Sequence, residues 1–319
     1  MSNSPTTIHG YEANRFIEML RSKLMLELDG TIQFLGGSSN LNLLLKSDND
    51  CYVLKVPALQ IDYEENPYDL QWRVHEIAYG HRLSNKPVAK GKLDYELPFF
   101  VTEYEEGITK QEYRSFSDEE LVAIRDSLSR FSDLRLPLPE YNNPTDYLNM
   151  CRKKIGQVES SGAKQREPLS DYLGKMKKIG NKLEQTMEGF PDWPADMMHG
   201  DFRPSNVILQ ETSVVLIDFE NACMGSSMYD LAYFFVEPPG SFEIPIQTPL
   251  VKTGERQKTM LRFVPLALFS CLTWTFIRLV HLEMGIVEEN LVSPDTQKML
   301  DEYFRQKSKQ ITDVVEMPT

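Results

Sequence analysis

Two short stretches decide the fold of this chain. The first reads His199-Gly200-Asp201-Phe202-Arg203-Pro204-Ser205-Asn206, and the second, shortly after it, reads Leu216-Ile217-Asp218-Phe219-Glu220. Each alone has an ordinary interpretation, because an Asp after a Gly is usually a turn residue and the second stretch resembles a strand end. In this order and at this spacing, with a lysine in an upstream β-rich run, they indicate a single site.

The acidic and amide side chains of these stretches suit phosphoryl transfer. That reaction needs a carboxylate that orients the attacking hydroxyl and accepts its proton, and Asp201 is the candidate. It also needs Mg²⁺ on the nucleotide phosphates, and this ion prefers oxygen ligands while keeping several waters. Asn206 and Asp218 can supply an amide oxygen and a carboxylate. The apolar run before Asp218 predicts a rigid strand that anchors it.

Composition and charge restrict the class of protein. The chain has 319 residues, of which 41% are hydrophobic and 25% charged, as in ordinary soluble globular proteins. Its net charge of −13 repels nucleic acid and anionic membranes, so we expect neither as a partner. The same charge favours an amine-bearing small molecule as the ligand. The alternative is that the acidity only maintains solubility.

The cysteines and the first residues predict a cytoplasmic protein. Cys51, Cys151, Cys223 and Cys271 form no CxxC pair and no zinc pattern, so we expect reduced thiols. Residues 1–7 lack the apolar core of a secretory signal.

The most apolar segment, residues 263–277, favours a buried helix over a membrane span. It is shorter than the roughly 20 residues that a membrane helix needs. It also contains Pro265, and Arg262 and Arg278 stand at its edges.

The first hundred residues are predominantly β-rich. Turn residues and apolar runs predict a hairpin over residues 31–57 and a buried strand over residues 97–104. Loosely spaced apolar residues predict one helix over residues 67–83.

The rest of the chain is predominantly helical. A helix is predicted over residues 117–131, where Ser117 and Glu120 fit a capping box. Further helices are predicted over residues 147–158, over residues 169–187 and from about residue 229 onward. The chain is therefore expected to be α+β, with a small β-rich lobe and a larger helical lobe.

A third motif, Tyr229-Asp230-Leu231-Ala232, follows the first two. Together the three motifs resemble those of the aminoglycoside phosphotransferase and choline kinase family, over about residues 25–290. The resemblance implies a protein-kinase-like fold with two lobes, an N-lobe at residues 1–106 and a C-lobe at residues 107–319. It also implies that Asp230 supports the catalytic loop structurally.

The resemblance implies a nucleotide site in the N-lobe. Lys55, in the middle of a predicted strand, resembles the lysine that contacts the α- and β-phosphates, and Glu76 is our candidate for its ion-pair partner. The backbone near Glu103, Tyr104 and Glu105 would receive adenine, and GTP is not distinguished from ATP. The resemblance also implies a turn that covers the phosphates, at Gly36, Gly37, Ser38, Ser39 and Asn40. The same residues also suit an ordinary hairpin turn.

Two residues depart from the family pattern. Arg203 stands where many members have His, and it either reaches the γ-phosphate or forms a structural ion pair. Glu220 follows the metal-binding segment in place of Gly, and it is either a second metal-side carboxylate or a local cap.

The family places its acceptor pocket in the helical lobe. Tyr233, Glu237 and Trp274 are our candidates to line it, since aromatic rings and carboxylates suit a cationic amine. The alternative is that the aromatic residues belong to the core.

We therefore expect an enzyme that transfers the γ-phosphate of ATP, with Mg²⁺, to a hydroxyl of a small and cationic acceptor. The first expectation is an aminoglycoside-phosphotransferase-like kinase. The alternatives are a choline- or ethanolamine-type kinase, another metabolite kinase, and a pseudokinase scaffold that binds nucleotide without turnover. The short segment between Asp218 and Asp230 and the lack of an APE motif disfavour a protein kinase.

Overall fold

The chain folds into two compact units. The computed structural model describes residues 7–94, 96–160, 167–187, 195–240, 248–251 and 254–316. The first unit comprises Met1–Glu106 and Gly285–Thr296, and the second comprises Gly107–Met284 and Gln297–Thr319. The segment Gly285–Thr296, which the sequence prediction assigned to the helical lobe, groups with the first unit.

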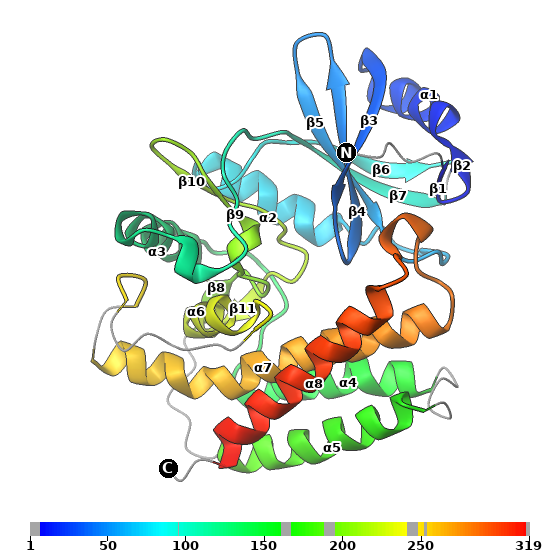
Figure 1. Cartoon of the computed structure of the whole chain (residues 1–319). Helices are drawn as coiled ribbons and strands as arrows, with labels where there is room; N and C mark the ends of the chain where they lie inside the picture. The colour runs from blue at the N-terminus through cyan, green and yellow to red at the C-terminus, as the bar shows by residue number, and fades with distance from the viewer. Residues whose placement is uncertain are drawn as a thin grey trace. The chain divides into compact units, whose positions relative to one another are not determined.

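An antiparallel sheet of five strands forms the centre of the first unit (Figure 1). The strand order is β3-β4-β5-β7-β6. The strand bounds are Leu28–Gly36 (β3), Asn40–Ser47 (β4), Cys51–Pro57 (β5), Pro87–Leu93 (β6) and Leu97–Glu103 (β7). The predicted hairpin and the predicted strand at residues 97–104 are confirmed. The sequence did not predict β6, an edge strand that buries few side chains and therefore lacks a clear apolar alternation.

Two helices complete the first unit, together with the short strands β1 (Thr7–Ile8) and β2 (Tyr11–Glu12). Helix α1 (Ala13–Leu24) buries Phe16, Ile17 and Leu20 in the same cluster as the apolar residues of β4 and β5. The sequence prediction assigned no element to these residues. Helix α2 (Asp69–Gly80) confirms the predicted helix over residues 67–83.

The buried carboxylate of Glu288 holds the segment Gly285–Thr296 in the first unit. Its side chain accepts hydrogen bonds from the His9 N–H (3.2 Å), from Gln60 Nε2 (2.8 Å) and from Asn290 Nδ2 (2.7 Å). Its own N–H donates to the carbonyl of Ala58 at 2.7 Å. The short 3₁₀ turn Glu289–Leu291 follows.

The second unit is predominantly helical (Figure 1). Its helices are α3 (Asp118–Ser132), α4 (Pro144–Glu159), α5 (Leu169–Thr186), α6 (Ser227–Val236), α7 (Glu255–Glu283) and α8 (Thr296–Glu316). Two short antiparallel pairs carry the motifs: β8 (Asp196–Met198) with β11 (Cys223–Gly225), and β9 (Val207–Leu209) with β10 (Val214–Leu216). The predicted capping box of α3 is present, with Glu120 N–H donating to Ser117 Oγ and Ser117 N–H donating to Glu120 Oε2.

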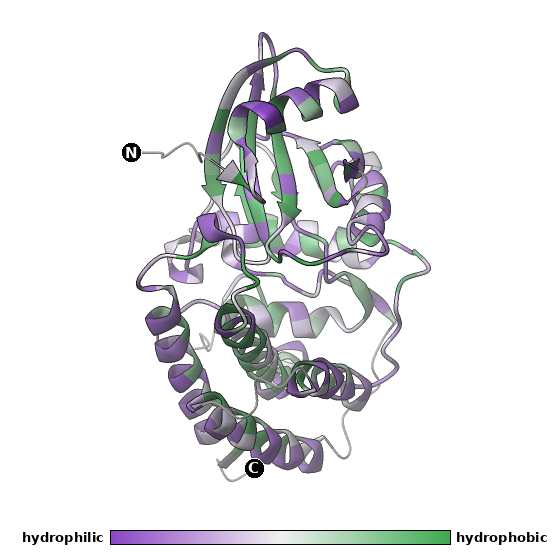
Figure 2. Ribbon diagram, turned by 90° about the vertical axis from the view of Figure 1, so that its right-hand side faces the viewer, coloured by the Kyte–Doolittle hydropathy of each residue, from purple (hydrophilic) through white to green (hydrophobic). Residues whose placement is uncertain are grey.

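Helix α7 is the core helix of this unit. It is the one helix in the described part of the chain that is long and apolar enough to cross a membrane, and 78% of its most apolar window is buried. Figure 2 shows hydrophilic residues on the outward sides of the peripheral helices and hydrophobic residues on their inward sides. Such burial is what the core helix of a globular protein shows.

Candidate active site

Residues 199–206 form a loop between β8 and β9 that ends in the 3₁₀ turn Pro204–Asn206. A buried carboxylate on α6, Asp230, supports this loop. It accepts hydrogen bonds from the N–H groups of His199 (2.7 Å) and Gly200 (2.9 Å). This is the structural role predicted for Asp230.

Gly200 meets a steric requirement in this loop. Its φ of +76° lies in the left-handed region, and a Cβ there would come within 2.1 Å of the carbonyl oxygen of Asn221. Only glycine therefore allows the loop to pass this close to the neighbouring backbone.

Asp201 is held by the other end of the same loop. The Nδ2 group of Asn206 donates to Asp201 Oδ2 at 3.0 Å and to its backbone carbonyl at 2.9 Å. Burial raises the pKa of Asp201 to about 7, Arg203 opposes this rise, and the carboxylates of Asp218, Glu237 and Glu220 add to it. A carboxylate with such a pKa is suited to take up a proton near neutral pH.

The segment around Asp218 is anchored by its neighbours. Phe219 is fully buried and stacks on Phe131, with ring centroids 5.2 Å apart. The Nε2 atom of His199 lies 2.9 Å from the carbonyl of Ile217, which can only accept, so Nε2 carries the hydrogen. Asp218 itself has a φ of +70°, a strained conformation for a residue other than glycine.

Asn206 and Asp218 fit the requirements of Mg²⁺. The Ile217 N–H donates to the carbonyl of Asn206 at 3.1 Å, so the two candidate ligands stand on adjacent backbone. Because Asn206 uses its amide nitrogen on Asp201, its Oδ1 is the atom that remains for an ion. No group of three or more His, Cys, Asp or Glu in the described residues could hold a metal, but a magnesium site needs only one or two such ligands.

Arg203 forms an ion pair with Glu237. Its Nη1 lies 2.9 Å from Glu237 Oε1, and its Nε lies 3.8 Å from Asp201 Oδ2. Burial alone would lower the pKa of Arg203, but the carboxylates of Asp201 and Glu237 outweigh burial and raise it. Of the two interpretations of Arg203, the structure therefore shows the ion pair. Glu237, which was predicted to contact the acceptor, forms this pair with Arg203.

The other two acceptor candidates lie in different surroundings. Tyr233 is buried on α6 and stacks on Tyr229, with ring centroids 5.8 Å apart. Burial raises the pKa of its phenol well above the ordinary value, and the charges of Asp201 and Glu237 contribute. Trp274 on α7 is 36% exposed and does not belong to the core.

Residues of α8 also support this site, and the sequence analysis did not identify them. Tyr303 donates its hydroxyl hydrogen to the carbonyl of Glu237 at 2.6 Å. The buried Lys307 donates to the carbonyls of Pro238 (2.8 Å) and Val236. No local motif marks these residues, because they cap the end of α6 from about 70 positions away in the sequence.

In the first unit, the predicted phosphate-covering residues divide into two groups. Gly36 and Gly37 lie at the β3–β4 turn with φ of +100° and +145°, and a Cβ on Gly37 would fall 1.8 Å from the carbonyl oxygen of Asn40. Ser38 and Ser39 follow in the turn. Asn40 is buried at the start of β4 and accepts a hydrogen bond from the hydroxyl of Tyr68 at 2.7 Å, so its side chain has a structural partner.

Lys55 lies on β5 with 7% of its surface exposed, but Glu76 is not placed to support it. Glu76 is on the exposed face of α2, whereas the buried face of that helix carries Gln71, Val74, His75 and Ala78. The predicted Lys55–Glu76 pair is therefore not formed among the described residues, since the prediction considered the charge of Glu76 and not its position on the helix. On the buried face, both side-chain amide atoms of Gln71 lack a hydrogen-bond partner among the residues that the structure describes.

The predicted adenine-binding segment leaves β7. The N–H of Glu103 donates to the carbonyl of Lys86, and the carbonyl of Glu103 accepts from Asn85 Nδ2, both at 2.9 Å. Tyr104 N–H donates to the carbonyl of Cys51 at 2.8 Å, and Glu105 follows outside the strand. The carbonyl oxygen of Glu103 has a second lone pair, which can still accept a hydrogen bond from a ligand.

Comparison with known proteins gives a family match over most of the chain. The sequence model of the phosphotransferase enzyme family matches residues 31–257. A comparison with curated protein sequences found no match.

Solved structures of kinases have the same fold. Choline kinase LicA from Streptococcus pneumoniae superposes with a TM-score of 0.62 at 18% identity, over 94% of this chain and 99% of that protein. Ethanolamine kinase from Plasmodium vivax has a TM-score of 0.64 at 13% identity, over 90% and 83%. Aminoglycoside phosphotransferase APH(4)-Ia, in a complex with ADP and hygromycin B, has a TM-score of 0.55 at 14% identity, over 95% and 99%. The predicted α+β, kinase-like fold is confirmed.

Proposed function

Since the chain belongs to the phosphotransferase enzyme family, we propose that it transfers the γ-phosphoryl group of ATP to a hydroxyl of a small acceptor molecule. The enzyme class predicted from the sequence, a small-molecule phosphotransferase, is confirmed by this family. The nucleotide, the metal ion and the acceptor are parts of the proposal.

The geometry of Asp201 carries the proposal. Its carboxylate is oriented by Asn206 Nδ2 at 3.0 Å, it lies near Arg203, and 16% of its side chain is exposed. A carboxylate that is positioned and still accessible can meet an acceptor hydroxyl.

In the proposed reaction, the acceptor oxygen forms a bond to the γ-phosphorus while the bond from that phosphorus to the β–γ bridging oxygen breaks. The proton of the acceptor hydroxyl passes to a carboxylate oxygen of Asp201, and ADP leaves with the bridging oxygen. Mg²⁺, held by Asn206 and Asp218, would neutralise charge on the phosphates. Asn206 keeps the carboxylate of Asp201 oriented throughout.

In the first unit, we assign the phosphates of ATP to Lys55 and to the turn at Gly36, Gly37, Ser38 and Ser39. Backbone N–H groups in such a turn can face an anion. GTP is the alternative nucleotide. We place the enzyme in the cytoplasm, where ATP is available.

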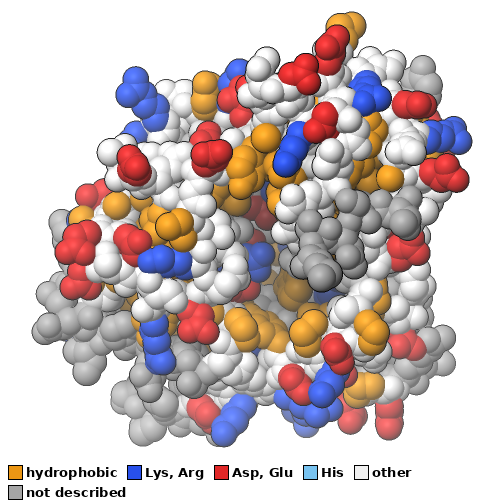
Figure 3. Space-filling model, turned by 45° about the horizontal axis from the view of Figure 1, so that its top comes forward, with side chains coloured by type: hydrophobic (Ala, Val, Ile, Leu, Met, Phe, Trp, Pro, Cys, Tyr) orange, Lys and Arg blue, Asp and Glu red, His pale blue; other side chains and the backbone are white. Residues whose placement is uncertain are grey.

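The acceptor that we propose first is an amine-bearing alcohol of the aminoglycoside type, with choline- or ethanolamine-type alcohols second. Its support is the net charge of −13 and the family, together with the named activities of the similar structures. On the face shown in Figure 3, Asp and Glu side chains are interspersed with Lys and Arg. Since Glu237 is paired with Arg203, acidic attraction of an amine depends on the remaining carboxylates near Asp201.

An ADP-release assay with Mg²⁺ and ATP tests the proposal. Aminoglycosides, amino alcohols, sugars and vitamin alcohols serve as acceptors, and Asp201→Asn is the control variant. We expect acceptor-dependent ADP release by the wild type and its loss in Asp201→Asn. A rise in Tm with Mg²⁺ and ATP, but no turnover with any acceptor, would instead favour a pseudokinase.

A further inference from the structure

Buried charged groups near the candidate site have polar partners. Arg203 pairs with Glu237 at 2.9 Å, and Lys307 donates to the carbonyl of Pro238 at 2.8 Å. Asp230 accepts two backbone hydrogen bonds. Such pairing is expected, because an uncompensated charge in a protein interior is strongly destabilising.

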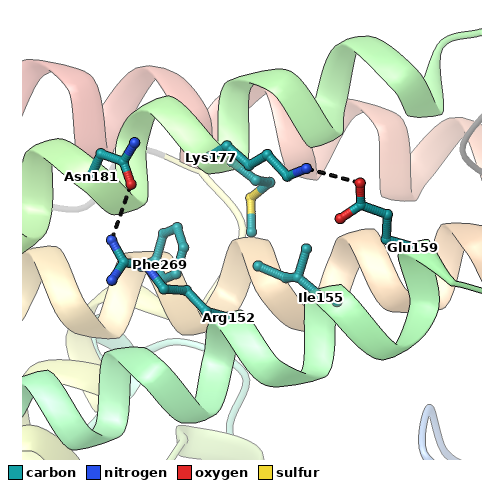
Figure 4. Close-up of a pocket in the computed structure, with 8 residues that line it drawn as sticks. Arg152, Ile155, Glu159, Lys177, Asn181 and Phe269 are labelled. Carbon is teal, nitrogen blue, oxygen red and sulfur yellow. Dashed lines mark hydrogen bonds and ion pairs between the residues drawn. The ribbon is translucent and has the colours of Figure 1, made fainter.

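A cavity of about 220 Å³ between α4, α5 and α7 follows the same rule (Figure 4). At its rim, Arg152 pairs with Glu184 and Lys177 pairs with Glu159, each at 2.9 Å. The cavity therefore presents no unsatisfied charge to a ligand.

Arg278 on α7 is the exception. Only 7% of its surface is exposed, yet no hydrogen bond or ion pair joins it to another residue in the described part of the chain. Burial lowers the pKa of Arg278, to about 10, and no carboxylate among the described residues opposes this effect. Its titratable neighbour is His281, whose pKa is lowered by burial and by the charge of Arg278, so a second positive charge is disfavoured there.

The position of Arg278 relates it to the candidate site. Cys271 lies two helical turns earlier on the same face of α7, which is about 10 Å along the helix. The thiol of Cys271 contacts the hydroxyls of Tyr233 and Tyr303, and Tyr233 in turn lies near Asp201. Arg278 is therefore about two helical turns from a side chain that packs beside the surroundings of Asp201, so an acceptor of about that length could have its hydroxyl at Asp201 and another group at Arg278.

We propose that Arg278 binds an anionic oxygen group, a carboxylate or a phosphate, of the acceptor. The planar guanidinium presents a fork of N–H donors that matches both groups, and the bound anion would compensate its buried charge. The inference rests on the proposed function, and it adds a negative group to an acceptor that was expected from the sequence to carry an amine.

Binding is tested first, by the Tm of the full chain in succinate, in inorganic phosphate and in sodium chloride of equal ionic strength. Arg278→Met is compared with Arg256→Met, which removes an exposed arginine of the same helix. We expect succinate or phosphate to raise the Tm of the wild type and Arg256→Met by a few degrees, and not that of Arg278→Met. Without anion, Arg278→Met should be at least as stable as the wild type, because it removes a largely buried charge that has no hydrogen bond or ion pair with the described residues.

Catalysis is tested with two acceptors that differ only in charge, 4-hydroxybutyrate and 4-hydroxybutanamide. We expect Arg278→Met to lower kcat/KM for the acid by about tenfold or more, and to leave kcat/KM for the amide unchanged. Phosphate and succinate distinguish the two anion classes in the binding experiment.

Several results would overturn the inference: no Tm rise with either anion, a rise that persists in Arg278→Met, or an anion-free Arg278→Met that is less stable than the wild type. A phosphate effect that is lost in Lys55→Met and kept in Arg278→Met would assign phosphate to the nucleotide site, which also overturns it. If the anion effect depends on Arg278 but no acceptor is phosphorylated, the anion site stands and the proposed function fails. If uncharged acceptors are phosphorylated and neither anion has an effect, the proposed function stands and the role of Arg278 fails.

Discussion

Asp201 and Asp230 are two carboxylates of the second unit that share a shifted pKa and differ in their partners. Burial raises the pKa of each to about 7. Asp230 is fully buried, and its two oxygens accept the backbone N–H groups of His199 and Gly200. Asp201 has one hydrogen bond from Asn206 and a nearby guanidinium, and part of its side chain is exposed.

The difference shows that a raised pKa alone does not identify a catalytic acid or base. The carboxylate whose oxygens are both occupied by backbone donors is structural. The carboxylate that keeps accessible oxygen and is oriented by a side chain can act on a ligand. Substitutions at and around the two residues can sharpen or break this comparison.

The largest effect is expected for Asp201→Asn, since the amide retains the shape of the side chain but cannot accept the proton. Phosphotransfer should fall by roughly 10²–10⁴-fold. The Tm at pH 8 should be unchanged or higher. The folded pKa of Asp201 lies above its ordinary value, so its contribution to stability is complete below about pH 4 and is lost as the pH rises through about 7. Steady-state kinetics measure the loss of phosphotransfer, and thermal unfolding at pH 8 measures the change in Tm. Retention of more than a tenth of the activity would contradict the role of Asp201.

Asp230→Ala should mainly affect folding. It leaves the buried N–H groups of His199 and Gly200 without their partner, which we expect to cost about 2–4 kcal/mol of unfolding free energy. Urea unfolding measures this loss, and Asp201→Asn is the matched control. A variant with unchanged stability and lost activity would give Asp230 a chemical role and remove the distinction between the two carboxylates.

Arg203→Met should alter the pH dependence of Asp201. Arg203 opposes the rise in the pKa of Asp201, so its removal should raise that pKa further. The acidic limb of the kcat/KM profile should then move to higher pH by roughly one unit, because an adjacent opposite charge typically lowers a carboxyl pKa by one to three units. Profiles from pH 5 to 9 test this, and an unmoved limb would assign the limb to another group.

The smallest effect is expected for Tyr303→Phe, which removes one hydrogen bond to the carbonyl of Glu237. The loss should be about 1 kcal/mol of stability and a few-fold in kcat/KM. Tyr172→Phe is the control. Tyr172 also donates a hydrogen bond to α8, but its acceptor is Asp301, and it does not contact Glu237 in this way. Equal losses of activity in both variants would indicate a general role of α8 in stability.

Local motifs were sufficient to predict the family and the pairing of residues within the 199–206 loop. The loop from His199 to Asn206 brings Asp201 and Asn206 together within five residues, so their hydrogen bond depends on local backbone geometry. The hairpins of the first unit and the cap of α3 follow from patterns of similarly short range. For these features, the side chains that matter are neighbours in the sequence.

The tertiary structure alone decided which charges are paired. The partner of Arg203 is 34 residues away on α6, and Tyr303 and Lys307 reach α6 from the far end of the chain. The sequence contains Glu76 and Arg278, but only packing shows that the first is exposed and that the second is buried with no carboxylate of the described residues beside it. Burial and pairing depend on contacts between distant segments, which residue types and short-range spacing do not specify.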